Sequence, residues 1–272
     1  MTEPWPDWAP KDLDLSRPSA ARMYDYYLGG AHNFEVDREV ARKALELVPD
    51  GPQLMRANRA FLHRAVRYLV EQGVRQFIDI GSGIPTVGNV HETVEQAAPG
   101  EGRVLYVDHD GVAVVHSEMI LGEDHPRVRV LQADLRRPQE ILESAPRRDL
   151  IDLDQPVAVL MVAVLHFVPE SDRPDELIRQ FHEAVVPGSH LVVSHGTDEG
   201  SSPTAARLAQ VYASAADRPT YRSRRRVGEL FAGWDLIDPG VVWVPQWRPD
   251  WPDEAEAGSS AMRWAAAVGR KS

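Results

Sequence analysis

Short apolar runs alternate with amphipathic segments along most of this chain, beginning near residue 76. Runs with the length and apolar content of strands lie at 76–80, 104–108, 128–132, 156–164, 189–195, 241–247 and 262–269. Segments typical of helices lie between most of them, at 86–98, 111–121, 138–145, 173–186, 204–216 and 223–232. Strands that alternate with helices predict an α/β fold with a mostly parallel sheet, covered by helices on both faces.

Two strand candidates give further detail. Residues 157–164 are apolar throughout, as expected of a central strand that is buried on both faces. The last two candidates have no helical pattern between them, because residues 248–260 are rich in Pro, Asp and Gly. Two strands joined by a loop pair most simply as an antiparallel hairpin. The pattern therefore predicts seven strands, one of them reversed.

The first third of the chain has a different character. Residues 1–20 are rich in Pro, Asp and Trp and show no period, which favours an extended arm. Residues 19–47 and 52–72 have helical patterns, and Gly73 is placed to end the second as a C-cap. We therefore expect an arm and helical extension over 1–73, which covers a ligand-binding domain over 74–272.

Composition excludes several classes of protein. The formal charge of −11 argues against broad binding to nucleic acid or to anionic membranes, although a local basic patch stays possible. No window approaches the ~20 apolar residues of a membrane span, and the first residues lack the pattern of a secretory signal. The absence of cysteine rules out thiolate zinc sites and a Cys nucleophile, and it fits a reducing cytoplasm. We expect a cytoplasmic protein that binds neither nucleic acid nor membranes.

The chemistry is concentrated where the first two strands end. Gly81-Ser82-Gly83 follows the first strand, and glycine lets the backbone pass close to a ligand. Asp108 ends the second strand, about 25 residues after Gly83, near the spacing seen in nucleotide-binding βαβ units. A carboxylate there can accept both hydroxyls of a ribose. Ligands of such sheets lie beyond the carboxyl ends of the strands, where Asp79, Asp134 and His166 also fall.

Each of these features has a plainer explanation. A lone Gly-x-Gly is often an ordinary tight turn between a strand and a helix. Asp108 and Asp134 could each serve as a helix cap. The functional interpretation depends on their coincidence at strand ends that the topology brings together.

A dinucleotide is the main competitor for this geometry. The dinucleotide fingerprint needs a small residue three places after the second glycine, and that place holds Thr86. A threonine would crowd the packing of strand against helix, so a nucleoside without phosphates fits better. S-adenosylmethionine is such a ligand.

The chain resembles an actinobacterial family of S-adenosylmethionine-dependent methyltransferases that was once known only as a domain of unknown function. The resemblance runs from near residue 16 to the last residues. Its glycine loop is common to many methyltransferases, and its first and last segments are more specific to the family. The matching segments are Ala21–Gly30 with Asn33 and Phe34, Arg56–Leu62, Phe77–Thr86 with Asn89–Glu92, Val107–Asp108, Ala133–Leu135, and Pro156–Val159 through Leu165–Pro169.

The resemblance implies a Rossmann-like seven-stranded methyltransferase sheet with an antiparallel C-terminal hairpin and an N-terminal helical extension. It implies methionine contacts at Asp79, Gly81 and Gly83, with Ser82 in the same loop, and it places the ribose at Asp108. The adenine would lie near Asp134 and Leu135. His109, next to the ribose carboxylate, would line the adenine or ribose edge.

Further candidates come from the helical extension. Tyr24 and Asn33 flank the pair Gly29-Gly30, and they belong either to a hinged lid over the cofactor or to a helix that simply ends there. Arg59 either pairs with the methionine carboxylate or is a surface residue on an amphipathic helix.

His166 is the candidate general base, and its alternative role is to shape the cofactor pocket. We expect no metal, because His91-Glu92 lacks a second His at helical spacing. The run 222–226 is basic, and we interpret it as the solvated start of a helix rather than a nucleic-acid patch.

The predicted function is therefore S-adenosylmethionine-dependent methyl transfer to a small molecule whose identity the sequence does not give. Two alternatives stay open. One is a regulatory protein that binds the nucleoside without catalysis, and the other is an NAD-dependent oxidoreductase, which Thr86 disfavours.

Overall fold

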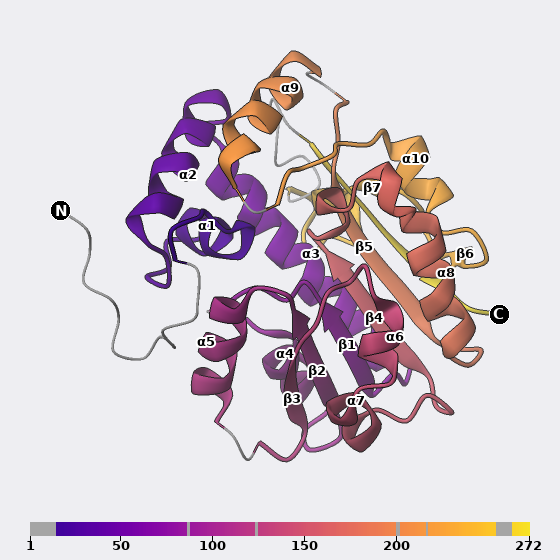
Figure 1. Cartoon of the computed structure of the whole chain (residues 1–272). Coiled ribbons are helices and arrows are strands. Elements are labelled where there is room, and N and C mark those ends of the chain that lie inside the picture. The colour runs from indigo at the N-terminus through magenta and orange to yellow at the C-terminus, as the bar shows by residue number, and fades with distance from the viewer. Residues whose placement is uncertain (1–14, 86–87, 123–124, 200–201, 216, 254–262) are drawn as a thin grey trace.

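The computed structural model of the chain contains one mixed sheet with helices packed on both faces (Figure 1). It describes residues 15–85, 88–122, 125–199, 202–215, 217–253 and 263–272. The strand order is β3-β2-β1-β4-β5-β8-β6, and β7 also pairs with β8. β1 to β5 pair in parallel, whereas β8 runs antiparallel to β5. The α/β class and the reversed last strand are both confirmed.

The described strands number eight, and two of them have only two residues. They are β1 Gln76–Ile80, β2 Arg103–Asp108, β3 Val128–Gln132, β4 Val157–Val162, β5 His190–Gly196, β6 Asp235–Leu236, β7 Val242–Trp243 and β8 Trp264–Arg270. The strand predicted over 241–247 was wrong in length. It pairs with β8 at Val242 and Trp243 only, and the chain then turns into the 3-10 helix Val244–Gln246, where Pro245 removes a backbone donor.

Most of the described helices follow the predicted segments, with shorter bounds at several ends, but the helix Ala145–Leu150 lies almost wholly beyond the predicted segment 138–145. The α-helices are α1 Ala20–Tyr27, α2 Glu35–Leu47, α3 Gly51–Glu71, α4 Val90–Ala97, α5 Gly111–Leu121, α6 Pro138–Leu142, α7 Ala145–Leu150, α8 Pro174–Ala184, α9 Ser202–Val211 and α10 Arg224–Glu229. The 3-10 helices are η1 Leu165–Phe167, η2 Glu170–Asp172, η3 Tyr212–Ser214 and η4 Val244–Gln246. Gly73, at φ +88°, follows α3 as predicted.

The helical segment predicted over 19–47 is two helices rather than one. Gly29 has φ +83°, a left-handed conformation that ends α1. Gly30 then passes so close to Asp25 that a Cβ at residue 30 would lie 1.9 Å from Asp25 Oδ1. The Gly-Gly pair therefore gives the chain a tight turn between α1 and α2.

Alternation along the strands divides the core between the two faces of the sheet. Ile78 and Ile80 point to the face covered by α6, α7, α8 and α10, and Phe77 points to the face covered by α3 and α4. α3 is thus one of the helices that cover the sheet. Its buried Arg64 donates to the carbonyl oxygens of Trp247 at 2.9 Å and Val244 at 2.8 Å.

The helices α1, α2 and α9 form a group on the side of the sheet where the parallel strands end (Figure 1). Ala44 and Val48 of α2 pack against Ala205 and Leu208 of α9. The tyrosine Oη atoms of Tyr27 and Tyr212 join this group by a hydrogen bond of 2.8 Å. Among the helices that the structure describes, none combines the length and apolar content needed to cross a bilayer.

Candidate functional site

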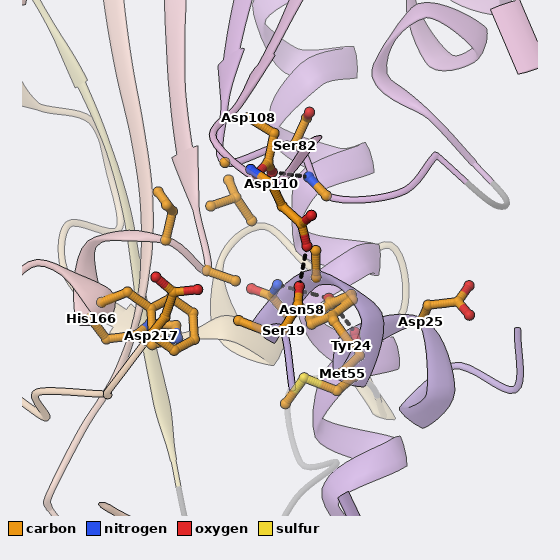
Figure 2. Close-up of a pocket in the computed structure, with 18 of the residues that line it drawn as sticks. Ser19, Tyr24, Asp25, Met55, Asn58, Ser82, Asp108, Asp110, His166 and Asp217 are labelled. Atoms are coloured by element: carbon orange, nitrogen blue, oxygen red, sulfur yellow. Dashed lines mark hydrogen bonds between the residues drawn. The ribbon is translucent and has the colours of Figure 1, made fainter. Parts of the chain in front are cut away.

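A cavity of about 160 Å³ lies beyond the carboxyl ends of β1, β2 and β4. The strand order reverses between β1 and β4, and open α/β sheets bind ligands at such a point. Nine of the residues selected from sequence line this cavity: Tyr24, Arg59, Asp79, Gly81, Ser82, Gly83, Asp108, His109 and His166. Figure 2 shows Ser82, Asp108 and Asp110 in one part of the cavity, and His166 and Asp217 in another.

The glycine loop is held in shape by the two strands beside it. Gly81 has φ +70°, and a Cβ there would lie 2.3 Å from the side chain of Val164, which follows β4. Gly83 also has a left-handed backbone, and its N–H donates to Asp108 Oδ2 at 2.8 Å. The loop therefore needs glycine at 81 both for its backbone conformation and for close packing.

Asp108 is buried at the end of β2 and organises the backbone around it. Its Oδ1 accepts the N–H of Asp110 at 2.9 Å, while Oδ2 accepts that of Gly83. Burial raises the pKa of Asp108, and these two N–H groups oppose the rise. The cap of α5 is Asp110, whose side chain accepts the N–H of Val112. Each Asp108 oxygen keeps a further lone pair for a ligand hydroxyl.

Asp79 lines the cavity and is only 6% exposed. Burial raises the pKa of this carboxyl to about 7, with Arg59 opposing the rise and Asp108 adding to it. A carboxylate that is this poorly solvated gains much from a cationic ligand.

Arg59 projects from α3 toward Asp79 and Tyr24. Its guanidinium carbon lies 5.7 Å from the centre of the Tyr24 ring. Arg59 Nε is buried and has no hydrogen-bond partner. The Tyr24 hydroxyl accepts from Asn58 Nδ2 at 3.1 Å and donates to the carbonyl of Met55 at 3.2 Å. Arg59 is therefore a cation in the cavity wall with an unused donor.

His109 contacts Asp217, a second residue of the cavity lining that the sequence did not suggest. Its Nε2 lies 3.3 Å from Asp217 Oδ1, and its Nδ1 lies 3.5 Å from Asp108 Oδ1. The hydrogen bond with Asp217 raises the pKa of His109 to about 9. This protonated imidazole ties the end of β2 to the segment between η3 and α10.

Asp134 and Leu135 line a smaller cavity that shares Gly81, Asp108 and His109 with the main one. Asp134 forms a bidentate pair with Arg136, with a closest N–O distance of 2.7 Å. Burial raises the pKa of Asp134, and the hydrogen bonds from Arg136 lower it by more, so that it lies below the ordinary value. Both residues are thus next to the main cavity rather than in it.

Asn33 lines neither cavity. Its Nδ2 donates to Asp25 Oδ2 at 2.8 Å and to the carbonyl oxygen of Gly30 at 2.9 Å. The prediction of a cofactor contact there does not match this placement, because the amide is used to hold the turn between α1 and α2.

The roof of the cavity is α1, as Ala20, Ala21 and Tyr24 line it. The Ser19 hydroxyl donates to Asp110 Oδ2, a bond drawn in Figure 2. Arg22, a buried residue of α1, pairs with Asp37 of α2 at 2.8 Å. The start of α1 is therefore bonded both to Asp110, after the end of β2, and to α2.

His166 lies on the turn after β4 and is buried. Burial lowers the pKa of its imidazole well below the ordinary value, and His195 and Arg222 lower it further. Its Nδ1 is buried and has no hydrogen-bond partner. The side chain is thus a neutral imidazole with a free polar atom at the cavity wall.

Sequence reasoning missed several residues of the wall and misjudged one behind it. Asp217, Asn58 and Trp264 line the cavity, yet none stands at the end of a parallel strand. Arg222 is buried rather than solvated. It donates to His195 Nε2 at 2.8 Å and to the carbonyl oxygens of Leu165 and Val168, and it pairs with Glu170.

The residue after β4 has an unusual backbone. Ala163 has φ +61°, and its N–H donates to Ser194 Oγ at 3.0 Å. The Ser194 hydroxyl in turn donates to Asn58 Oδ1 at 2.6 Å. These bonds hold the turn after β4 against α3, and a strained turn of this kind is common at functional sites. In the described residues, no group of three or more His, Asp or Glu side chains is arranged to hold a metal ion.

The sheet order with its reversed last strand, together with a glycine loop and an acidic residue ending β2, defines the Rossmann-like methyltransferase fold. The model of the S-adenosyl methyltransferase family, Methyltransf_19, matches residues 6–272. The chain belongs to this family, as its sequence predicted.

Two solved structures support the assignment. A candidate methyltransferase from Thermobifida fusca YX is 36% identical, covers 98% of this chain and 99% of its own, and superposes with a TM-score of 0.90. A DUF574 family protein from Streptomyces avermitilis MA-4680 is also 36% identical, with 95% and 99% covered and a TM-score of 0.89. No curated protein matches the chain significantly.

Proposed function

We propose that the protein is an S-adenosylmethionine-dependent methyltransferase that acts on a small molecule. The observation that carries the proposal is the set of complementary groups in one cavity. Asp79 is a buried carboxylate suited to an ammonium, Arg59 has a free donor suited to a carboxylate, and Asp108 has lone pairs suited to ribose hydroxyls. All three residues line the same cavity, and S-adenosylmethionine carries an ammonium, a carboxylate and ribose hydroxyls.

The residues fit this cofactor as follows. Asp79 and Arg59 would hold the two charged groups of the methionine moiety, and the backbone of Gly81 to Gly83 would pass beneath it. Asp108 would hold the ribose, with His109 at its edge. Asp134 and Leu135 would border the adenine in the adjoining cavity. When bound, S-adenosylmethionine supplies a methyl group on a sulfonium, and the protein contributes mainly position and exclusion of water.

Within the helical extension predicted over 1–73, α1 belongs to this proposal as the cover of the cofactor, whereas α3 covers the sheet. Tyr24 and the start of α1 line the cavity from above, and Ser19 bonds to Asp110 at its rim. Opening of α1 to admit the cofactor would break the bond between Ser19 and Asp110, and closure would restore it.

A dinucleotide fits the cavity less well. A pyrophosphate would need a helix N-terminus directly after the glycine loop. In the described residues, the next helix after Gly83 begins at Val90. Thr86, on which the sequence argument depended, lies outside the described residues.

Calorimetric titration tests the proposal most directly. We expect S-adenosylmethionine and S-adenosylhomocysteine to bind with a stoichiometry of one and to raise the melting temperature, whereas NADH should do neither. Formation of S-adenosylhomocysteine with an added acceptor separates an enzyme from a regulatory protein that only binds the cofactor. Binding of NADH in preference to both sulfur compounds would refute the proposal.

We expect the affinity for S-adenosylhomocysteine to fall as the pH drops below about 7. The pKa of Asp79 in the free protein is raised to about 7, so below that pH the ammonium must displace a proton from the carboxyl. The decline should approach tenfold for each pH unit. Titrations between pH 5.5 and 8 measure it, and Asp79→Asn is the control in which this decline should disappear. A flat profile in the wild type would show that no cation binds Asp79.

Arg59→Met should weaken the binding of S-adenosylhomocysteine roughly tenfold, because one charge-assisted hydrogen bond is lost. The affinity for 5′-methylthioadenosine should not change, because that compound lacks the carboxylate. Arg56→Met is the matched control, since Arg56 is an exposed residue of the same helix. Equal losses for both ligands would mean that Arg59 only shapes the cavity.

A further inference from the structure

The cavity has two chemically different ends, arranged along the sheet. The charged residues lie where β1 and β2 end. Beyond β4, β5 and the start of β8, the lining is aromatic. The aromatic end consists of Tyr27, His166, Phe167, Tyr212, Tyr221 and Trp264.

These rings form a continuous wall, although they come from five parts of the chain. The ring centres of His166 and Trp264 are 5.1 Å apart in an edge-to-face arrangement, and those of His166 and Phe167 are 4.3 Å apart. A Cβ on Gly196 would lie 3.1 Å from the Tyr221 ring and 3.5 Å from Trp264 Nε1. Gly196 therefore lets two of the rings approach each other.

The aromatic end is electrically neutral. Burial raises the pKa of Tyr27 to about 12, and it also raises the pKa values of Tyr212 and Tyr221. His166 is uncharged because its pKa is low. The nearest acidic residue of the lining, Asp217, is already paired with His109. An anion at this end would lose its hydration without gaining a partner, which is costly.

A buried polar atom at this end can bond to a ligand. His166 Nδ1 is buried without a hydrogen-bond partner, and the residue is 4% exposed. It stands on the turn after β4, beside the strand whose loop would hold the methionine moiety. A hydroxyl placed there would satisfy the imidazole nitrogen and would lie beside the methyl group.

We propose that the aromatic end is the acceptor site, and that the acceptor is an uncharged aromatic molecule that carries a hydroxyl group. This inference rests on the proposed function. In the reaction, the hydroxyl oxygen forms a bond to the methyl carbon, and the methyl–sulfur bond breaks with its electron pair left on sulfur. The hydroxyl proton passes to His166 Nδ1 and then to water. A weak base suffices, because an alkylated hydroxyl is a strong acid until it loses that proton.

The test uses 2-naphthol as a probe on protein saturated with S-adenosylhomocysteine. We expect 2-naphthol to bind at least fivefold more tightly than decahydro-2-naphthol, which has the same skeleton without aromatic faces. The anion 2-naphthoate should bind at least tenfold more weakly than 2-naphthol. With S-adenosylmethionine, 2-methoxynaphthalene and S-adenosylhomocysteine should form in equal amounts.

Variants make the test specific to this wall. Tyr221→Leu should weaken the binding of 2-naphthol at least fivefold without changing the affinity for S-adenosylhomocysteine. Trp251→Leu is the control, because Trp251 is an exposed aromatic residue, and it should change neither. His166→Phe keeps an aromatic ring, so it should retain part of the 2-naphthol binding while methylation is lost.

The outcomes separate this inference from the function on which it rests. Failure of S-adenosylhomocysteine to bind would overturn both. Normal binding of S-adenosylhomocysteine, together with 2-naphthol that binds no better than its saturated analogue or than 2-naphthoate, would overturn the acceptor site alone. The same holds if Tyr221→Leu leaves the affinity for 2-naphthol unchanged.

Discussion

Asp79→Asn is expected to stabilise the free protein and to weaken cofactor binding at the same time. The loss of affinity for S-adenosylhomocysteine should be roughly a hundredfold, since a hydrogen-bonded charge pair in a buried site contributes about 1.5–3 kcal/mol. The gain in stability has a separate cause, because the wild-type carboxylate is held where water cannot solvate it.

The pH dependence gives the sign of that gain. The pKa of Asp79 is raised from 3.8 to about 7 by folding, so the folded protein binds a proton that the unfolded chain releases. The wild type therefore loses stability as the pH rises from about 4 to 7. Above pH 7 the loss of stability is complete and on the order of 4 kcal/mol, and the variant avoids this loss.

Denaturant unfolding at pH 8 and pH 5, with calorimetric titration at pH 8, measures both effects. The stability advantage of the variant should shrink at pH 5, where the wild-type carboxyl holds its proton. Asp149→Asn serves as control, because it makes the same change at an exposed position of α7. A variant that binds S-adenosylhomocysteine as tightly as the wild type would exclude Asp79 as the ammonium site.

Asp108→Ala should weaken the binding of S-adenosylhomocysteine by tenfold or more, through two effects that both come from the loss of the carboxylate as an acceptor. The ribose loses its acceptor, and the N–H groups of Gly83 and Asp110 lose theirs. One or two charge-assisted hydrogen bonds account for at least a factor of ten at 1.4 kcal/mol per decade. The affinity alone cannot separate the direct effect from the effect on the loop.

A thermodynamic cycle with two ligands separates them. In the wild type, S-adenosylhomocysteine should bind more tightly than its 2′,3′-dideoxy analogue, and in Asp108→Ala this preference should vanish. Any loss of affinity that both ligands share measures the effect of the variant on the glycine loop. A preference for the ribose hydroxyls that survives in the variant would place the ribose elsewhere.

The sequence predicted the sheet well because its strands are apolar and its connections are regular. The residues at the ends of the parallel strands, Asp79, Asp108 and His166, all reached the cavity, since parallel strands end at one edge. The hairpin was less predictable. Residues 241–247 have the composition of a strand, but the chain leaves the sheet after Trp243 and forms a 3-10 helix over Val244–Gln246, where Pro245 lacks a backbone donor.

Residues from irregular segments were harder to find. Asp217 has no neighbouring pattern that would place it at the cavity mouth, and it is defined only by its contact with His109. Arg222 stands in a basic run, which normally lies in solvent. Its burial depends on carbonyl groups from Leu165 and Val168, more than fifty residues away, and no local pattern records such partners.

The contacts of α3 have a consequence for the order in which the molecule forms. Its Asn58 bonds to Ser194, and its Arg64 bonds to Val244 and Trp247. Because these partners stand more than a hundred residues later in the sequence, the helix leaves the ribosome well before they do. Trp264, which completes the cavity wall, is synthesised later still. Contacts between distant parts of a chain form slowly, so we infer that the cavity is among the last features to assemble during synthesis. A nascent chain halted before residue 264 would carry Asp79 and Asp108 without an enclosed place to hold a ligand.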